Sequence, residues 1–266
     1  MKFRLFGLLA LMLALTFSFF ACSDNSTDNN LTEGDYNDPN YQAARTNTEM
    51  IVNSFLQEAD QTSDYIGFDG SEPMQACDSL SIVFDDATCW WHLYLDYSDD
   101  STNSTLLFID SLKFQDAEGC QQFPDSFTTT SIEYRAFLDI DAVADSGTFI
   151  VNANENFLLE GIQEDTCVIN AAANSNMDIA SGLYEATLDY TGILDEIKFL
   201  TQELMYEENP RPVAGTLYLD LTVYGSNQQG SGSWHWSVTI TFNEGGYHAR
   251  AESGENYWEW DITYPA

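Results

Sequence analysis

The 266-residue sequence has only 8 lysine and arginine residues against 43 aspartate and glutamate residues, and its formal net charge is −35. This shortage of basic side chains argues against nucleic acid and anionic membrane surfaces as partners of the folded domain, because a strongly negative protein repels phosphate groups. Aromatic residues, by contrast, make up 14% of the chain. They supply enough surface for burial to exclude disorder throughout. The length suits one large domain or two small ones.

Motifs of the common catalytic classes are missing as well. The chain has no G-x-S-x-G turn, no H-E-x-x-H motif and no glycine-rich phosphate loop, and it has only 3 histidines. His92 and His235 are expected on the polar side of their strands, and His248 is equally uninformative. Asp139 and Asp141 share a strand face, as acid and base do in a glycosidase, but 43 carboxylates produce such pairs by chance. We therefore predict no catalytic residue, no enzyme activity and no cofactor.

Acid-rich loops raise the question of calcium binding. The candidates are Asp96, Asp99, Asp100 and Asn103 in one loop and Asn152, Asn154 and Asn156 in another. Neither group has the glycine and the twelfth-position glutamate of an EF-hand loop. We predict solvated loops and no metal site.

The first 21 residues have the features of a signal peptide. Lys2 and Arg4 precede the apolar run Leu5–Phe20, which ends at Ala21 and Cys22. An uncleaved anchor helix is the alternative, but it needs a longer apolar span. Cleavage would leave 6 basic and 43 acidic residues, a charge of 6 − 43 = −37.

The small residue directly before a cysteine resembles the lipobox of bacterial lipoproteins. The resemblance implies that Cys22 is lipid-modified, for example with palmitate, and becomes the first residue of the mature protein. Phe19 and Phe20 depart from the leucine and the small residue that are usual at these two positions. Ser23 resembles the residue found in lipoproteins sent to the outer membrane. We expect a lipid-anchored protein of the cell envelope, at the outer membrane, on its periplasmic or surface face.

Residues 22–40 are expected to be the lipidated cysteine and a disordered acidic tether. From residue 23 the segment has five acidic residues, no basic one and almost no apolar one, so it cannot pack. It also resembles the surface-export tethers of some Gram-negative lipoproteins. Residues 41–266 are expected to form a single domain.

A helix is predicted over residues 39–60. Asp38 is suited to the N-cap and Pro39 to the first helical position. Apolar residues then recur on one helical face, namely Ile51, Val52, Phe55, Leu56 and Ala59. We expect this amphipathic helix to cover a sheet.

From Leu80 onward the sequence predicts strands, because apolar and polar residues alternate over whole strand lengths. The apolar rows include Trp91 to Tyr97, Ile132 to Ile140, Leu217 to Val223, Trp234 to Phe242 and Trp258 to Tyr264. About ten strands joined by short turns predict a mainly β fold, a long antiparallel meander with one apolar and one wet face. Such a sheet must curl, so we predict a strongly curved sheet or barrel carrying the N-terminal helix. A β-sandwich is the alternative.

Four cysteines follow Cys22: Cys77, Cys89, Cys120 and Cys167. An even number in an exported chain predicts two disulfides, and three connectivities remain open. A metal site or reactive thiol is less favoured, because the chain has no C-x-x-C pair.

The C-terminal tryptophans are the residues with most functional interest. Trp234 and Trp236 share one strand face, Trp258 and Trp260 share another, and the short strand at 247–250 lies between. The simplest interpretation is that the four indoles fill the core. Alternatively they line a cavity for an apolar ligand, or stack on sugars as a glycan platform. Given the charge of the chain, either ligand would be uncharged or cationic.

Two functions follow. A helix packed on a curved sheet resembles, in outline and without a shared motif, lipoprotein carriers of the Lol type, which implies a carrier or binding module for an apolar ligand. The alternative is a structural or adhesive surface lipoprotein that binds glycan or a protein partner.

Overall fold

The computed structural model describes residues 31–60, 80–99, 103–144, 147–181, 184–206, 210–227 and 230–264. Strands dominate these ranges, with one long and one short helix. In chain order the elements are β1 (Thr32–Glu33), α2 (Pro39–Asp60), β2 (Leu80–Asp85), β3 (Trp90–Asp99), β4 (Ser104–Asp116), β5 (Gly119–Gln121), β6 (Ser131–Ala144), β7 (Gly147–Glu160), β8 (Thr166–Ser181), β9 (Tyr184–Leu200), α4 (Thr201–Tyr206), β10 (Pro212–Asn227), β11 (Gly230–Asn243), β12 (Gly246–Ser253) and β13 (Asn256–Thr263).

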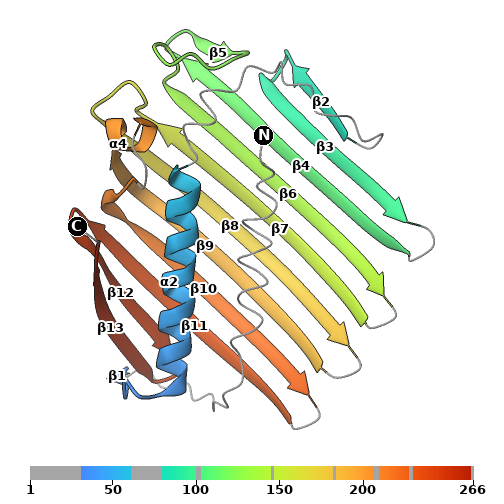
Figure 1. Cartoon of the computed structure of the whole chain (residues 1–266), viewed down its shortest axis with the longest axis vertical. Coiled ribbons are helices and arrows are strands. Elements are labelled where there is room, and N and C mark those ends of the chain that lie inside the picture. Colours follow the sequence, from blue (N-terminus) through green and yellow to red (C-terminus); the bar gives the residue numbers. More distant parts are fainter. Residues whose placement is uncertain are drawn as a thin grey trace.

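The strands form one curved sheet of 13 strands (Figure 1). Their order is β1-β13-β12-β11-β10-β9-β8-β7-β6-β4-β3-β2, with β5 paired to β4. Every neighbouring pair is antiparallel except β1 with β13. The predicted meander with its helix is confirmed. The sheet is not closed, so the barrel was wrong, and a single sheet in the described residues also replaces the β-sandwich.

The strand pattern separates two faces of this sheet. In β10 the residues Leu217, Leu219 and Leu221 are buried, whereas Tyr218 and Asp220 between them are exposed. Directly opposite residues in neighbouring strands share a face, so the same division extends across the sheet. We call the face of Leu219 the helix-side face, because α2 packs on it, and the face of Asp220 the outer face.

Helix α2 begins at Pro39 and ends at Asp60, as the sequence predicts. The Asp38 carboxylate accepts a hydrogen bond from the backbone N–H of Asn40 at 2.8 Å, which satisfies one of the free donors at the helix start. No helix among the described residues is long and apolar enough to cross a membrane.

The helix crosses the β9–β13 half of the sheet (Figure 1). Near its C-terminal end the Phe55 ring lies 6.2 Å from both Phe199 and Phe242, on β9 and β11. Near its N-terminal end Tyr41 contacts Trp258 and Trp260 on β13. We call strands β9–β13 the helix-covered half. Strands β2–β7 form the helix-free half, because neither described helix lies over them in Figure 1.

The segment before the helix corrects the expected extent of the tether. Thr32 and Glu33 form β1 and pair in parallel with Asn256 and Tyr257 of β13. Gly34 lies so close to the Trp258 indole that an added Cβ would be 2.4 Å from its Nε1. Residues 32–40 therefore belong to the folded domain, because backbone pairing and contact with the indole hold them there.

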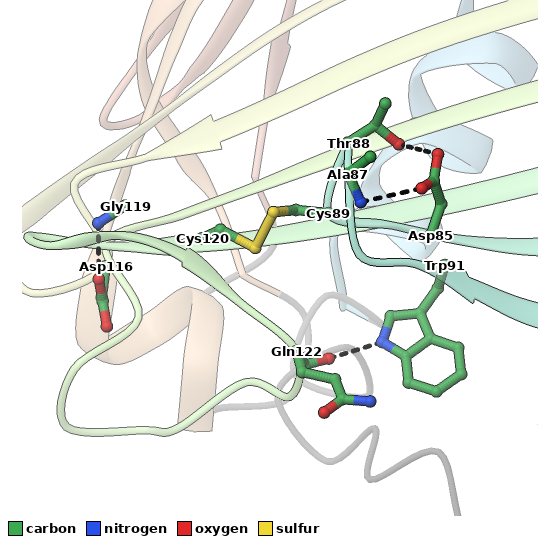
Figure 2. Close-up of a disulfide and its surroundings, with 9 residues drawn as sticks. All are labelled: Asp85, Ala87, Thr88, Cys89, Trp91, Asp116, Gly119, Cys120 and Gln122. Carbon is green, nitrogen blue, oxygen red and sulfur yellow. Dashed lines mark hydrogen bonds between the residues drawn. A yellow bond between two sulfur atoms is a disulfide. The ribbon is translucent and has the colours of Figure 1, made fainter.

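The cysteines only partly match the prediction of two disulfides. Cys89 and Cys120 form one, which joins the β2–β3 turn to β5 (Figure 2). Cys167, by contrast, is a buried free thiol, so the expected second bridge through it is wrong. Its position facing the core explains this, and burial also raises the pKa of its thiol. Cys77 lies outside the described residues.

Further bonds order the corner around the disulfide (Figure 2). The Trp91 indole N–H donates to the Gln122 carbonyl at 2.6 Å. The Asp85 carboxylate accepts from the Thr88 hydroxyl and the Ala87 N–H, and these bonds lower the pKa of Asp85. The disulfide and these hydrogen bonds thus stabilise one corner of the helix-free half. The other half is stabilised by packing against α2.

Candidate functional site

The four predicted tryptophans all lie on the helix-side face. Trp234, Trp236, Trp258 and Trp260 are 7%, 2%, 1% and 7% exposed. The glycan platform made of exposed indoles is therefore excluded, because these rings are not available for stacking on a sugar. The expectation that the four share one side of the sheet is confirmed.

The indoles form two separate pairs. Trp258 and Trp260 lie opposite Ala251 and Ala249 of β12, and the Tyr41 ring is 6.1 and 5.8 Å from them. The Trp258 Nε1 donates to the Asp35 carbonyl at 3.2 Å. This pair is packed between the helix and the sheet and acts as core.

The second pair lies further along β11. Trp236 is opposite Leu221, and Trp234 is opposite Val223 of β10. The Trp234 ring lies close to the backbone of Gly232, where an added Cβ would be 3.2 Å from the ring. This pair is also buried, so the four indoles as a group are core and not the lining of an open surface.

Asn47 is the unusual residue of helix α2. It is 2% exposed, and neither its Nδ2 nor its Oδ1 has a hydrogen-bond partner among the described residues. A buried amide without partners costs about 1–3 kcal/mol. Such a residue is expected where a ligand or an ordered water supplies the missing bonds.

Helix geometry indicates the direction in which Asn47 projects. Successive residues are about 100° apart around a helix, so Asn47 lies on the flank opposite to Arg45 and Glu49. Those two residues are joined at 2.7 Å, and their charges influence the pKa of Tyr247 on β12. Asn47 lies on the other flank of the helix.

Two carboxylates interrupt the apolar helix-side face of that half. Asp110 on β4 and Glu155 on β7 lie directly opposite Ala136, one on each side. Neighbouring strands are about 4.8 Å apart, so the two backbones are about 10 Å apart with only a methyl group between them. Both acidic side chains are half-buried.

The row that contains this pair continues with small residues. Glu155 is opposite Ala173, which is opposite Gly192. Larger apolar residues border the row, including Phe108, Leu112, Tyr134 and Leu138. No lysine or arginine of the described strands β3–β8 faces this side, because Lys113 and Arg135 both point to the outer face. We call Asp110, Ala136, Glu155 and Ala173 the carboxylate row.

The sequence carries a signal for this row that pattern analysis missed. Asp110 lies between Phe108 and Leu112, and Glu155 lies between Ala153 and Phe157, in positions that the strand period assigns to the apolar face. Charged residues at such positions are rare without a specific role. The buried position of Asn47 depends on the helix–sheet contact, which no local pattern indicates.

Two tyrosines at the helix-covered end are affected by burial. Burial raises the pKa of Tyr247 to about 12 and raises the pKa of Tyr264 as well. The Tyr264 hydroxyl has no hydrogen-bond partner among the described residues, and the Arg211 guanidinium lies 5.7 Å from its ring.

The remaining candidates lie on the outer face. His92 contacts the Ser111 hydroxyl at 2.9 Å, and His235 contacts Asp220 at 3.0 Å. Asp139 and Asp141 are exposed on the same face. No group of metal-binding side chains occurs within the ranges that the structure describes. Cys22 and Asp100 lie outside these ranges. The prediction of two acidic loops is wrong for Asp96 and Asp99, which lie on β3, and for Asn152, Asn154 and Asn156, which lie on β7.

Comparisons with known proteins found no matching family model, no similar curated protein and no similar solved structure.

Proposed function

We propose that this protein is a lipid-anchored binding module of the cell envelope that holds an apolar ligand with a polar or cationic end. The ligand lies on the helix-side face of the helix-free half, beside α2. The observation that carries this proposal is the carboxylate row, two acidic side chains set into an apolar face that neither described helix covers.

The chemistry of the face defines the ligand class. Apolar residues such as Phe108 and Leu138 line this face, and at 7% and 2% exposed they are buried in the ligand-free structure, so a hydrocarbon chain binds there only if these side chains become exposed. Asp110 and Glu155 favour an amine or a hydroxyl group over an anion, because carboxylates accept hydrogen bonds and attract positive charge.

The anchor proposal rests on the sequence alone. The apolar run that ends at Cys22 supports lipidation there and a location in the cell envelope, at the outer membrane. A domain held near a membrane by a short segment has ready access to amphipathic ligands. The outline of helix and curved sheet, which resembles Lol-type carriers, supports the same proposal without a shared motif.

Native mass spectrometry tests the binding proposal. The full-length lipoprotein is extracted from its envelope in a mild detergent, and bound ligand is measured as mass beyond the lipidated chain. We expect the parent to carry such mass and the Asp110→Asn/Glu155→Gln variant to lose most of it. The matched control is Asp139→Asn/Asp141→Asn, which removes two charges from the outer face and should keep the ligand.

Equal retention by the two double variants would contradict the carboxylate row as the binding site. A parent that carries no extra mass in any extract would contradict the binding module itself. Palmitate labelling tests the anchor separately, because Cys22→Ser should abolish the label and leave the precursor unprocessed.

A further inference from the structure

The outer face of the sheet carries a second, independent array of polar side chains. One row crosses six strands in register, from Asp139 through Asn152, Asn176, Asp189 and Thr222 to His235. The next row includes Asn154, Asn174, Thr191, Asp220 and Ser237. Neighbouring members of a row are about 4.8 Å apart.

Hydrogen bonds hold several of these groups in place. Asp189 accepts from the Asn176 amide at 2.5 Å, and Asp178 accepts from the Thr187 hydroxyl at 2.6 Å. Asp220 accepts from the Ser237 hydroxyl at 3.0 Å. Each carboxylate keeps further lone pairs that face the solvent, so the array is a set of oriented acceptors.

Two exposed tyrosines bracket the array. Tyr218 and Tyr224 on β10 are both 44% exposed on the outer face. They are six residues apart on one strand, hence about 20 Å apart, with Asp220 and Thr222 between them. Exposed rings along a strand are suited to stacking on sugar rings, as amphipathic aromatic side chains do at wet interfaces.

The charge of this face determines which sugar polymer fits. Strands β7, β8, β10 and β11 contain no lysine or arginine, and Lys198 at the end of β9 lies 3.6 Å from Glu196. Asp139, Asp178 and Asp189 have no lysine or arginine within 4.0 Å among the described residues. The face thus repels acidic polymers and attracts cations.

We infer that the outer face of β7–β11 is a binding platform for a cationic amino-sugar polymer. Tyr218 and Tyr224 stack on sugar rings, and Asp178 and Asp189 bind the protonated amines. This platform lies on the opposite side of the sheet from the proposed ligand site, so either function stands or fails without the other.

The test measures binding of short oligomers to the mature lipoprotein at pH 5.5, in a detergent whose molecules carry no charge. The probes are the hexamer of glucosamine, the hexamer of N-acetylglucosamine and hexalysine. We expect the glucosamine hexamer to bind at least about tenfold more tightly than its acetylated counterpart, because acetylation removes the charge. Added salt should weaken that binding.

Variants connect the binding to the residues. Tyr218→Ala/Tyr224→Ala should weaken the glucosamine hexamer about tenfold, and Tyr94→Ala, on the outer face of β3, should leave it unchanged. Asp178→Asn/Asp189→Asn should weaken it similarly. The charge-matched control is Glu118→Gln/Glu244→Gln, two exposed turn positions, which should have little effect.

Thermal melts of all variants establish that each is folded. Equal affinity for the two sugar hexamers, or no binding of the glucosamine hexamer at millimolar concentration, would overturn the inference. The inference would also be overturned if hexalysine bound as tightly as the glucosamine hexamer and the tyrosine variant kept its full affinity. The face would then recognise charge alone.

Discussion

The two halves of the sheet share a fold but are held together differently. The helix-covered half, β9–β13, packs its apolar face against α2 through Phe55 and Tyr41. The helix-free half, β2–β7, presents an equally apolar face, yet its described links are the strand ladders and the Cys89–Cys120 corner.

This difference supports the proposed position of the ligand site. The tryptophans, which are the most conspicuous feature of the sequence, lie in the helix-covered half and are core. The acidic side chains on the helix-side face are in the half without a helix. Carboxylates seldom serve as packing in an apolar face, and we therefore propose the ligand surface there.

The largest effect is expected from Trp258→Ala in the helix-covered half. The indole is 1% exposed and lies between Tyr41, Gly34 and the sheet, so its removal should lower the free energy of unfolding by about 3–5 kcal/mol. Denaturant unfolding measures the loss. A loss below 1 kcal/mol would contradict the interpretation that packing against α2 stabilises this half of the sheet.

Removal of the disulfide should affect the helix-free half first. Cys89→Ser/Cys120→Ser opens a link between residues 31 apart in sequence, which should cost about 2–4 kcal/mol. Hydrogen exchange should accelerate in β2, β3 and β5 more than in β10–β12. Uniform acceleration would show that the two halves unfold as one unit.

Alkaline pH should weaken the helix-covered half through Tyr247. Its folded pKa of about 12 exceeds the unfolded value near 10, so the folded state holds its proton longer than the unfolded state does. The contribution of Tyr247 to stability is therefore constant below pH 10 and falls between pH 10 and 12, by up to about 2 kcal/mol. Tyr247→Phe should remove this part of the pH dependence in urea titrations, whereas Tyr94→Phe should not.

The smallest effect concerns Asn47. Replacement by leucine, of similar size, removes a buried amide without partners and should stabilise the ligand-free protein by about 1 kcal/mol. Thermal melts measure the effect. Loss of stability in the ligand-free state would show that the amide already has its partners.

Much of the fold was predictable because its signals are local. Asp38 and Pro39 mark the helix start, and the alternation from Leu217 to Val223 marks a strand face. In β7 Asn152, Asn154 and Asn156 alternate with Val151, Ala153 and Glu155, but asparagine is uncommon in strands, so the sequence signal for this strand is weaker. Pairing of Thr32 with Asn256 depends on backbone contacts over a long separation, which composition does not reveal.

The candidate site was less predictable. Large aromatic residues in a sequence can suggest a binding site, but the burial of Trp236 and Trp258 shows that these two pack in the core. Asp110 and Glu155 become significant only when register places them on either side of Ala136. The register between strands depends on the tertiary structure. The alternation within one strand indicates only that Asp110 or Glu155 is an acidic residue on the apolar face.

Hydrogen exchange of the full-length protein, as extracted and after removal of any bound ligand by detergent exchange, tests the central claim most directly. The account predicts that removal accelerates exchange in β4, β6 and β7, which lie under the ligand, and leaves β10–β12 unchanged under α2. Identical exchange before and after removal, or equal acceleration in both halves, would contradict a ligand on the helix-free half.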